Sequence, residues 1–177
     1  LGISRVINRM NTAIGKAAGW LILVAVLVSA GNAVARKSFD LSSNAWLELQ
    51  WYLFGAVFML CAAYTLLQNE HVRIDILISR LPRRARNGVE IFGHIFFLMP
   101  FALLMLYLSV PFFLRSYAIG EHTGDAGGLL LWPAKILLPI GFALLALQGL
   151  SELVKRIAIL RGDLPDDAAP DEQTGPH

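Results

Sequence analysis

Four long stretches with few or no charged residues dominate the hydropathy pattern of the chain. They span residues 17–35, 46–68, 89–114 and 129–154. A hydrocarbon core about 30 Å thick requires about 20 helical residues, and each stretch reaches or nearly reaches that length. Because backbone polar groups in lipid must be bonded within their own segment, each stretch is expected to be a helix. The pattern predicts an all-α membrane protein with four transmembrane helices.

Three segments outside these stretches have patterns of their own. Residues 1–16 mix basic side chains with apolar ones at helical spacing, which predicts a short amphipathic helix on the inner membrane surface. Residues 69–88 form an arginine-rich loop, and we expect an interfacial helix there that ends at Pro82. Residues 162–177 are acidic and lack apolar periodicity, so we expect a disordered tail.

The first stretch has a second interpretation. Its last residues, Ala33-Val34-Ala35, resemble a signal-peptidase site. However, the apolar run is longer than the hydrophobic region of a typical signal peptide, and Arg36 and Lys37 follow it directly. A retained transmembrane helix is therefore favoured over a cleaved leader.

The composition agrees with a membrane protein. Hydrophobic residues make up 56% of the chain and charged residues 16%, against about 25% charged residues in soluble domains. The net charge of +2 gives no reason to expect nucleic acid as a partner. The single cysteine, Cys61, excludes an intramolecular disulfide and a cysteine-rich metal centre.

The distribution of Lys and Arg predicts the orientation. Eleven of these residues lie before the first stretch, between the second and third, or after the fourth, and three lie in the other two loops. Cytoplasmic loops carry the excess of positive charge. Both termini and the arginine-rich loop should therefore face the cytoplasm, and residues 36–45 and 115–128 should face outward.

Small residues and prolines within the stretches predict how the helices pack and bend. Ala25, Ser29 and Ala33 recur every fourth residue on the first helix, and such faces allow helices to approach closely. Prolines should kink the third and fourth helices; they are Pro100, Pro111, Pro133 and Pro139.

Two charged residues fall at similar shallow depth on the outer side of the membrane. Glu48 lies two residues inward of Trp46, and Lys135 lies three residues inward of Trp132. Contact between Glu48 and Lys135, or between Glu48 and Arg36 or Lys37, would offset the cost of placing charges near lipid. A salt bridge or a contact to a partner protein is favoured over an ion or proton site, because a lone shallow acid is a poor ion cage.

Histidines raise the alternative of a membrane redox subunit. His71 and His94 are both expected near the inner surface, and two histidines on facing helices can ligate b-type haem. Haem ligation needs both rings at one depth inside the bundle, whereas His71 begins a loop. A hydrogen-bonded cluster at the inner surface is therefore favoured, and no cofactor or metal is expected.

Residues 32–82 contain a series of motifs that resembles a known family. The chain is similar there to the small membrane subunit (DctQ-type) of tripartite ATP-independent periplasmic (TRAP) transporters. The motifs that carry the resemblance are Asn32-x-x-x-Arg36, Trp46-x-Glu48-Leu49-x-Trp51, Gly55-Ala56, His71-Val-Arg73-Ile-Asp75 and Leu81-Pro82.

The resemblance implies a function without chemistry of the chain's own. It implies a small scaffold subunit, not an enzyme, in the bacterial inner membrane. The subunit would pack against a large membrane subunit that imports an organic acid, driven by sodium. It would also help to dock the periplasmic substrate-binding protein.

The resemblance also implies roles for individual residues. Trp46, Glu48 and Trp51 would stabilise the second helix and its contacts. His71, Arg73 and Asp75 would anchor the inner interfacial segment. Charged residues of the outer loops, Arg36 among them, would contact the binding protein.

Overall fold

The computed structural model describes residues 2–39, 43–68 and 82–161, and its regular elements there are helices. They are α1 (Gly2–Phe39), α2 (Asn44–Leu67), α4 (Arg83–Gly93), the π-helix η1 (His94–Leu98), α5 (Met99–Ile119), α6 (Trp132–Lys135) and α7 (Leu137–Arg161).

Four helical spans are long and apolar enough to cross a membrane. They are Gly2–Phe39, Asn44–Leu67, Gly88–Ile119 and Trp132–Leu160. The prediction of an all-α membrane protein with four spans is confirmed. The first span continues without a break from the segment expected to be a surface helix, so residues 2–39 form one helix about 57 Å long. The interfacial helix expected before Pro82 and the acidic tail lie outside the described residues.

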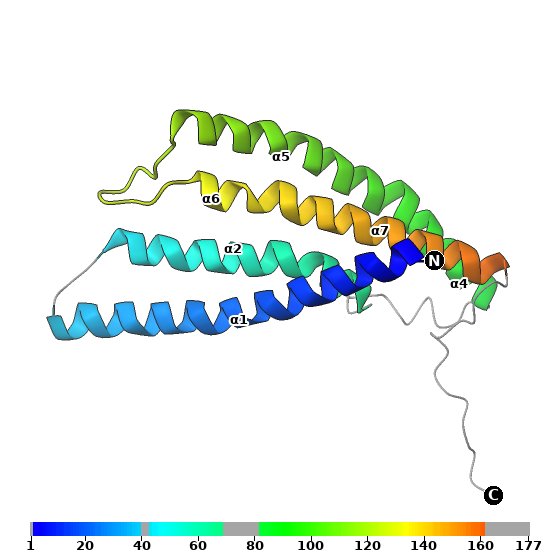
Figure 1. Ribbon diagram of the computed structural model, residues 1–177, viewed down its shortest axis with the longest axis horizontal. Helices are drawn as coiled ribbons and strands as arrows, with labels where there is room; N and C mark the ends of the chain where they lie inside the picture. The colour runs from blue at the N-terminus through cyan, green and yellow to red at the C-terminus, as the bar shows by residue number, and fades with distance from the viewer. Residues whose placement is uncertain (1, 40–42, 69–81, 162–177) are drawn as a thin grey trace, which may run out of the picture.

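The spans form a flattened row rather than a square bundle (Figure 1). The order across the row is α1, α2, α7 and α5, and the first part of α1 also crosses over to contact α7. In the most apolar window of α7, 50% of the residues are buried, against 11–17% in the other three spans. The helix α7 is therefore the centre of the protein, and α1 and α5 are its edges.

One face of α1 with heptad spacing packs against both α7 and α2. Ser4, Asn11, Ala18 and Ala25 are buried at intervals of seven residues on α1. A seven-residue repeat keeps one face of a helix against its neighbour at a shallow crossing angle. Gly15 lies on the same face, and a Cβ there would overlap the ring of Tyr64 on α2.

The packing differs in part from the expected small-residue face. Of the three residues Ala25, Ser29 and Ala33, Ala25 is buried and the other two are exposed. The heptad face turns away from the four-residue stripe after one turn, because 3.6 residues per turn does not keep i, i+4 and i+8 on one line.

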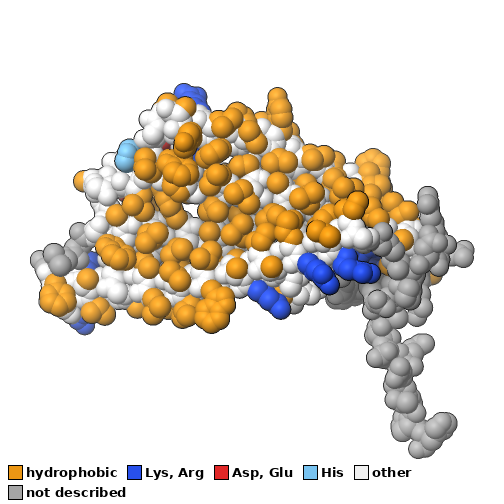
Figure 2. Space-filling view, in the orientation of Figure 1, with side chains coloured by type: hydrophobic (Ala, Val, Ile, Leu, Met, Phe, Trp, Pro, Cys, Tyr) orange, Lys and Arg blue, Asp and Glu red, His pale blue; other side chains and the backbone are white. Residues whose placement is uncertain are grey.

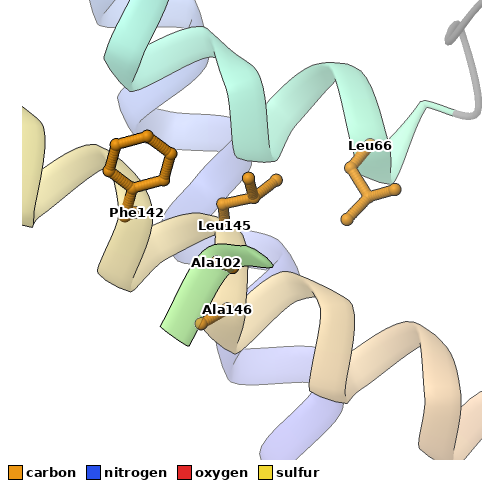
Figure 3. Packing of buried hydrophobic residues seen from close by; sticks show 5 residues of the cluster. All are labelled: Leu66, Ala102, Phe142, Leu145 and Ala146. Atoms are coloured by element: carbon orange, nitrogen blue, oxygen red, sulfur yellow. The ribbon is translucent and has the colours of Figure 1, made fainter. Parts of the chain in front are cut away.

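A hydrophobic core surrounds α7 where α2 and α5 meet it. Figure 3 shows Phe142, Leu145 and Ala146 of α7 between Leu66 of α2 and Ala102 of α5. The close approach of α2 depends on Gly141, where a Cβ would lie 2.9 Å from the backbone oxygen of Met59. Small residues at the contact thus replace the hydrophobic driving force that is missing between helices in lipid.

Irregular turns occur beside two of the four prolines, whereas Pro111 lies inside the continuous helix α5. Pro100 has no N–H for the helix turn before it, and the chain widens there into η1, where the Met99 N–H donates to the carbonyl of His94. Pro139 likewise cannot donate to the carbonyl of Lys135, and the helix is interrupted between α6 and α7 at Ile136.

Candidate functional site: polar contacts at the two ends of the helices

Side chains of the apolar spans are largely uncovered. Figure 2 shows hydrophobic side chains over most of the visible face, with Lys and Arg toward its two ends and along the first part of α1. Among the described residues, no group of three or more His, Cys, Asp or Glu could hold a metal ion. The polar features with defined geometry lie at the hairpin end, where α5 connects to α6, and at the terminal end, where α1 begins and α7 ends.

A short hairpin, residues 120–131, connects α5 to α6. Gly120 ends α5 in the left-handed region at φ +60°, and Gly127 adopts φ +73° within the turn. Both conformations favour glycine. The hairpin is closed by a bond from the Thr123 N–H to the Leu129 carbonyl at 3.1 Å and by one from the Leu131 N–H to the Glu121 carbonyl at 2.8 Å.

One face of α2 holds the backbone of this hairpin. Asn44, Glu48 and Tyr52 are four residues apart, so they share a face of the helix. The Asn44 amide donates to the Ala126 carbonyl at 3.2 Å, and the Tyr52 hydroxyl donates to the Leu130 carbonyl at 3.0 Å.

Glu48 is the buried member of this set. It is 2% exposed, and its Oε2 accepts a hydrogen bond from the Leu129 N–H at 2.7 Å. The Thr123 and Asp125 side chains also lie beside its carboxylate. Glu48 therefore lies beneath the turn of the hairpin and fixes it to the first turns of α2.

Lys135 fixes the other strand of the hairpin. Its ammonium group pairs with Glu121 and lies 4.2 Å from the centroid of the Phe112 ring. The bond to Lys135 lowers the pKa of Glu121 below its ordinary value. Beside this pair, the rings of Tyr117 and Trp132 meet edge to face at 5.5 Å.

The structure thus shows partners for the two charged residues singled out from the sequence. Lys135 is paired with Glu121, and Glu48 is bonded to Leu129, so the two residues hold the same hairpin through different contacts. Trp46 and Trp51 are exposed on α2, and Arg36 is exposed near the end of α1. The remaining candidates, His71, Arg73 and Asp75, lie outside the described residues.

An apolar groove runs between α1 and α2 at the hairpin end, with a volume of about 620 Å³. Its residues on α1 are Val24, Leu27, Val28, Gly31, Asn32 and Ala35, and Ser43 and Trp46 line the other side. The exposed indole of Trp46 therefore forms part of the wall of this open groove.

A second polar cluster joins α1 to α7 at the terminal end. Gln148 is fully buried, accepts a hydrogen bond from the Asn11 amide at 2.7 Å and donates one to Glu152 at 2.8 Å. The hydroxyl oxygens of Ser4 and Ser151 are 2.6 Å apart. We call this set the α1–α7 polar cluster: Ser4, Asn8, Asn11, Gln148, Ser151 and Glu152.

Ion pairs extend this cluster toward the end of α7. Lys155 lies 2.5 Å from Glu152, and the Arg156 Nε lies 2.8 Å from Glu90 on α4. Glu90 and Arg156 are both largely buried. The start of α1, the end of α7 and α4 are therefore held by polar contacts, most of them buried.

His94 lies one turn after Glu90, in η1. Its Nδ1 lies 2.8 Å from the Glu90 carbonyl oxygen, and its buried Nε2 has no hydrogen-bond partner among the described residues. No observation here supports haem, and the proposed pairing with His71 stays a prediction because His71 lies outside the described residues.

The sequence interpretation missed most of these contacts, although two signals were present. Asn44, Glu48 and Tyr52 are spaced as one helix face, and Ser4, Asn8 and Asn11 form a stripe of uncharged polar residues on α1. The apolar residues of this segment predicted a surface that faces the membrane. Ile3, Val6 and Met10 are exposed, whereas Ser4 and Asn11 of the polar stripe are buried.

A family model matches most of the chain. The match covers residues 24–158, and the model is that of the DctQ component of the tripartite ATP-independent periplasmic transporters. The chain therefore belongs to the DctQ family and is a component of a multi-subunit membrane transporter. No curated protein matches the chain significantly. The resemblance seen in residues 32–82 is confirmed by this match, which also includes the third and fourth spans.

Proposed function

We propose that the chain is the immobile small subunit of a sodium-driven TRAP transporter that imports an organic acid. A separate large membrane subunit would carry the substrate, and a periplasmic substrate-binding protein would deliver it. The chain itself would perform no chemistry. The observation that carries this proposal is that buried polar contacts fasten the helices at both ends while the outward faces of the edge helices stay uncovered.

Polar contacts between helices at both ends of the protein support an immobile subunit. Glu48 and Lys135 hold the hairpin at one end, and the α1–α7 polar cluster holds the other. Interhelical hydrogen bonds in membranes contribute about 0.6 kcal/mol on average, and up to about 1.7 kcal/mol. Several such bonds on one pair of helices oppose sliding between them.

Uncovered faces support a lateral partner. Large apolar side chains of α5 such as Phe101, Leu104 and Tyr107 are at least half exposed. On the other edge, the apolar groove between α1 and α2 includes small residues, among them Gly31 and Ala35. Membrane helices pack against surfaces of this composition, so we place a helix of the large subunit in the groove beside Trp46.

The charge distribution supports the orientation. The terminal end carries Arg5, Arg9, Lys16, Lys155 and Arg156, and the hairpin end carries Arg36, Lys37 and Arg115. With the excess of basic residues inside, both termini face the cytoplasm of a bacterium with two membranes, and the hairpin end faces the periplasm. His122 and Asp125 are then exposed on a fixed loop, where they can contact the binding protein.

Reconstitution tests the proposal. The large subunit and binding protein are placed in liposomes with this chain, without it, or with a Gly19→Ala variant as a matched control, because Gly19 has open space around it. We expect stoichiometric co-purification with the large subunit, and sodium-dependent uptake with wild-type chain and control only. Full uptake without the chain would contradict a scaffold role.

A further inference from the structure

The first half of α1 presents basic side chains along one line. At about 100° per residue, Arg5, Arg9 and Lys16 fall within about 40° of one another around the helix, and all three are exposed. We call these three residues the basic stripe. Trp20 continues it within about 60° of Arg5, and 71% of this tryptophan is exposed.

The basic stripe faces away from the other helices. Ser4 and Asn11 lie about a third of a turn from it and are buried in the α1–α7 polar cluster. Their bonds to Ser151 and Gln148 fix the rotation of α1 about its own axis. Figure 2 shows Lys and Arg side chains projecting in a row from the lower edge of the molecule, along the first half of α1.

The charges of the basic stripe are not neutralised within the described part of the chain. Helix α1 contains no Asp or Glu between Gly2 and Phe39. Neither Arg5, Arg9 nor Lys16 pairs with a described carboxylate. Three cations on one side of a helix that itself contains no acid attract an anionic surface.

An apolar stripe lies directly beside the basic one. Ile3 is 80% exposed, Val6 is 66% exposed, and Met10 is exposed as well. Adjacent basic and apolar faces are typical of helices in the headgroup region, where apolar side chains enter the acyl boundary and Lys and Arg reach the phosphates. An acidic protein surface would match the charges but would leave these apolar side chains in water.

We propose that the basic stripe binds the phosphate groups of anionic phospholipids in the leaflet at the terminal end. The choice of the cytoplasmic leaflet rests on the orientation proposed above, whereas the binding itself does not. Each basic residue near an anionic membrane strengthens the attraction about fivefold, so three of them should enrich anionic lipid by more than tenfold over zwitterionic lipid.

Native mass spectrometry of the purified full chain tests this inference. The chain is incubated with equal amounts of phosphatidylglycerol and phosphatidylcholine, and the lipids that remain bound are counted. The test variant is Arg5→Gln/Arg9→Gln/Lys16→Gln. The matched control, Arg36→Gln/Lys37→Gln/Arg115→Gln, removes the same charge from the hairpin end. A charge-preserving variant, Arg5→Lys/Arg9→Lys/Lys16→Arg, separates loss of charge from loss of fold.

The expected result is that wild type, control and charge-preserving variant retain phosphatidylglycerol preferentially, and that the preference falls at least tenfold in the test variant. Equal retention by the test variant, or an equal loss in the control, would overturn the inference. Competition by inorganic phosphate as effective as that by phosphatidylglycerol would show a site for free anions and would overturn it too. Because no uptake is measured, failure here is distinguishable from failure of the proposed transport role.

Discussion

The buried carboxylate of Glu48 accepts a hydrogen bond from the backbone N–H of Leu129, 81 residues later in the chain, at 2.7 Å. This bond connects the second span to the loop between the third and fourth spans. It turns a glycine-rich hairpin, which has little side chain to pack, into a fixed surface at one end of the protein.

Removal of the Glu48 carboxylate should free the hairpin. Hydrogen bonds to charged groups contribute about 1.5–3 kcal/mol, so we expect Glu48→Ala to lower stability by that order. Amide hydrogen exchange should accelerate in residues 123–130, and docking of the binding protein should weaken. Gln50→Ala, two residues away on a half-buried position, is the control and should leave exchange in the hairpin unchanged. Unaltered exchange in Glu48→Ala would show that the hairpin is stable without the bond to Glu48.

Acid should weaken the contact between Glu121 and Lys135. Because the pKa of Glu121 is lowered in the folded protein, the pair contributes stability above the ordinary carboxyl pKa of 4.5. That contribution disappears as the pH falls through the lowered value. Thermal unfolding of wild type and Lys135→Met should therefore differ at pH 7, begin to converge below pH 4.5 and coincide once the pH is below the lowered pKa of Glu121. A difference that persists unchanged in acid would exclude the ion pair as its source.

Gly15 should be sensitive to the addition of a single methyl group. A Cβ there would overlap the Tyr64 ring, whereas Gly19 has no atom within 4 Å of the equivalent position. Alanine favours a helix over glycine by about 1 kcal/mol at either site, but overpacking costs about 1–3 kcal/mol. Gly15→Ala should thus lower the unfolding temperature in detergent, and Gly19→Ala should hold or raise it. The same effect from both would argue against close packing of α1 on α2.

The Asn11 and Gln148 side chains should be coupled energetically. Replacement of each with Leu, singly and together, gives a double-mutant cycle for their 2.7 Å hydrogen bond. We expect a coupling of about 0.6–1.7 kcal/mol, which is the range for interhelical bonds in membranes. Asn11→Leu combined with Ser109→Ala on α5 serves as the uncoupled control. Zero coupling between Asn11 and Gln148 would show that their hydrogen bond does not stabilise the protein.

Hydropathy predicted the fold well because the bilayer constrains it so strongly. Backbone N–H and C=O groups in lipid must be hydrogen-bonded within their own segment, so four apolar stretches of this length form four helices. The depth of Glu48 and Lys135 could also be inferred, since both lie close to tryptophans that prefer the interface. Their partners could not, because a hairpin backbone such as that of Leu129 has no sequence signal of its own.

The packing was less predictable than the spans. Residues 1–16 looked like a surface helix, since their pattern shows apolar and basic faces. The third face, with Ser4 and Asn11, is the buried one. Hydropathy scales treat such polar residues as solvent-facing, whereas between membrane helices they bond to one another. The close approach of α1 to α2 and of α2 to α7 likewise depends on Gly15 and Gly141, whose role appears only when the facing residues are known.

The most direct test of the account is to lock the subunit while the transporter works. Ser4 and Ser151 have hydroxyl oxygens 2.6 Å apart, a spacing compatible with a disulfide after replacement of both by Cys. In a Cys61→Ser background, oxidation of Ser4→Cys/Ser151→Cys would bond α1 to α7, and Ser4→Cys alone controls for the oxidant. If the chain is an immobile scaffold, proteoliposomes with the large subunit and binding protein will take up substrate equally fast before and after oxidation. Uptake that stops on oxidation and returns with reductant would contradict the account.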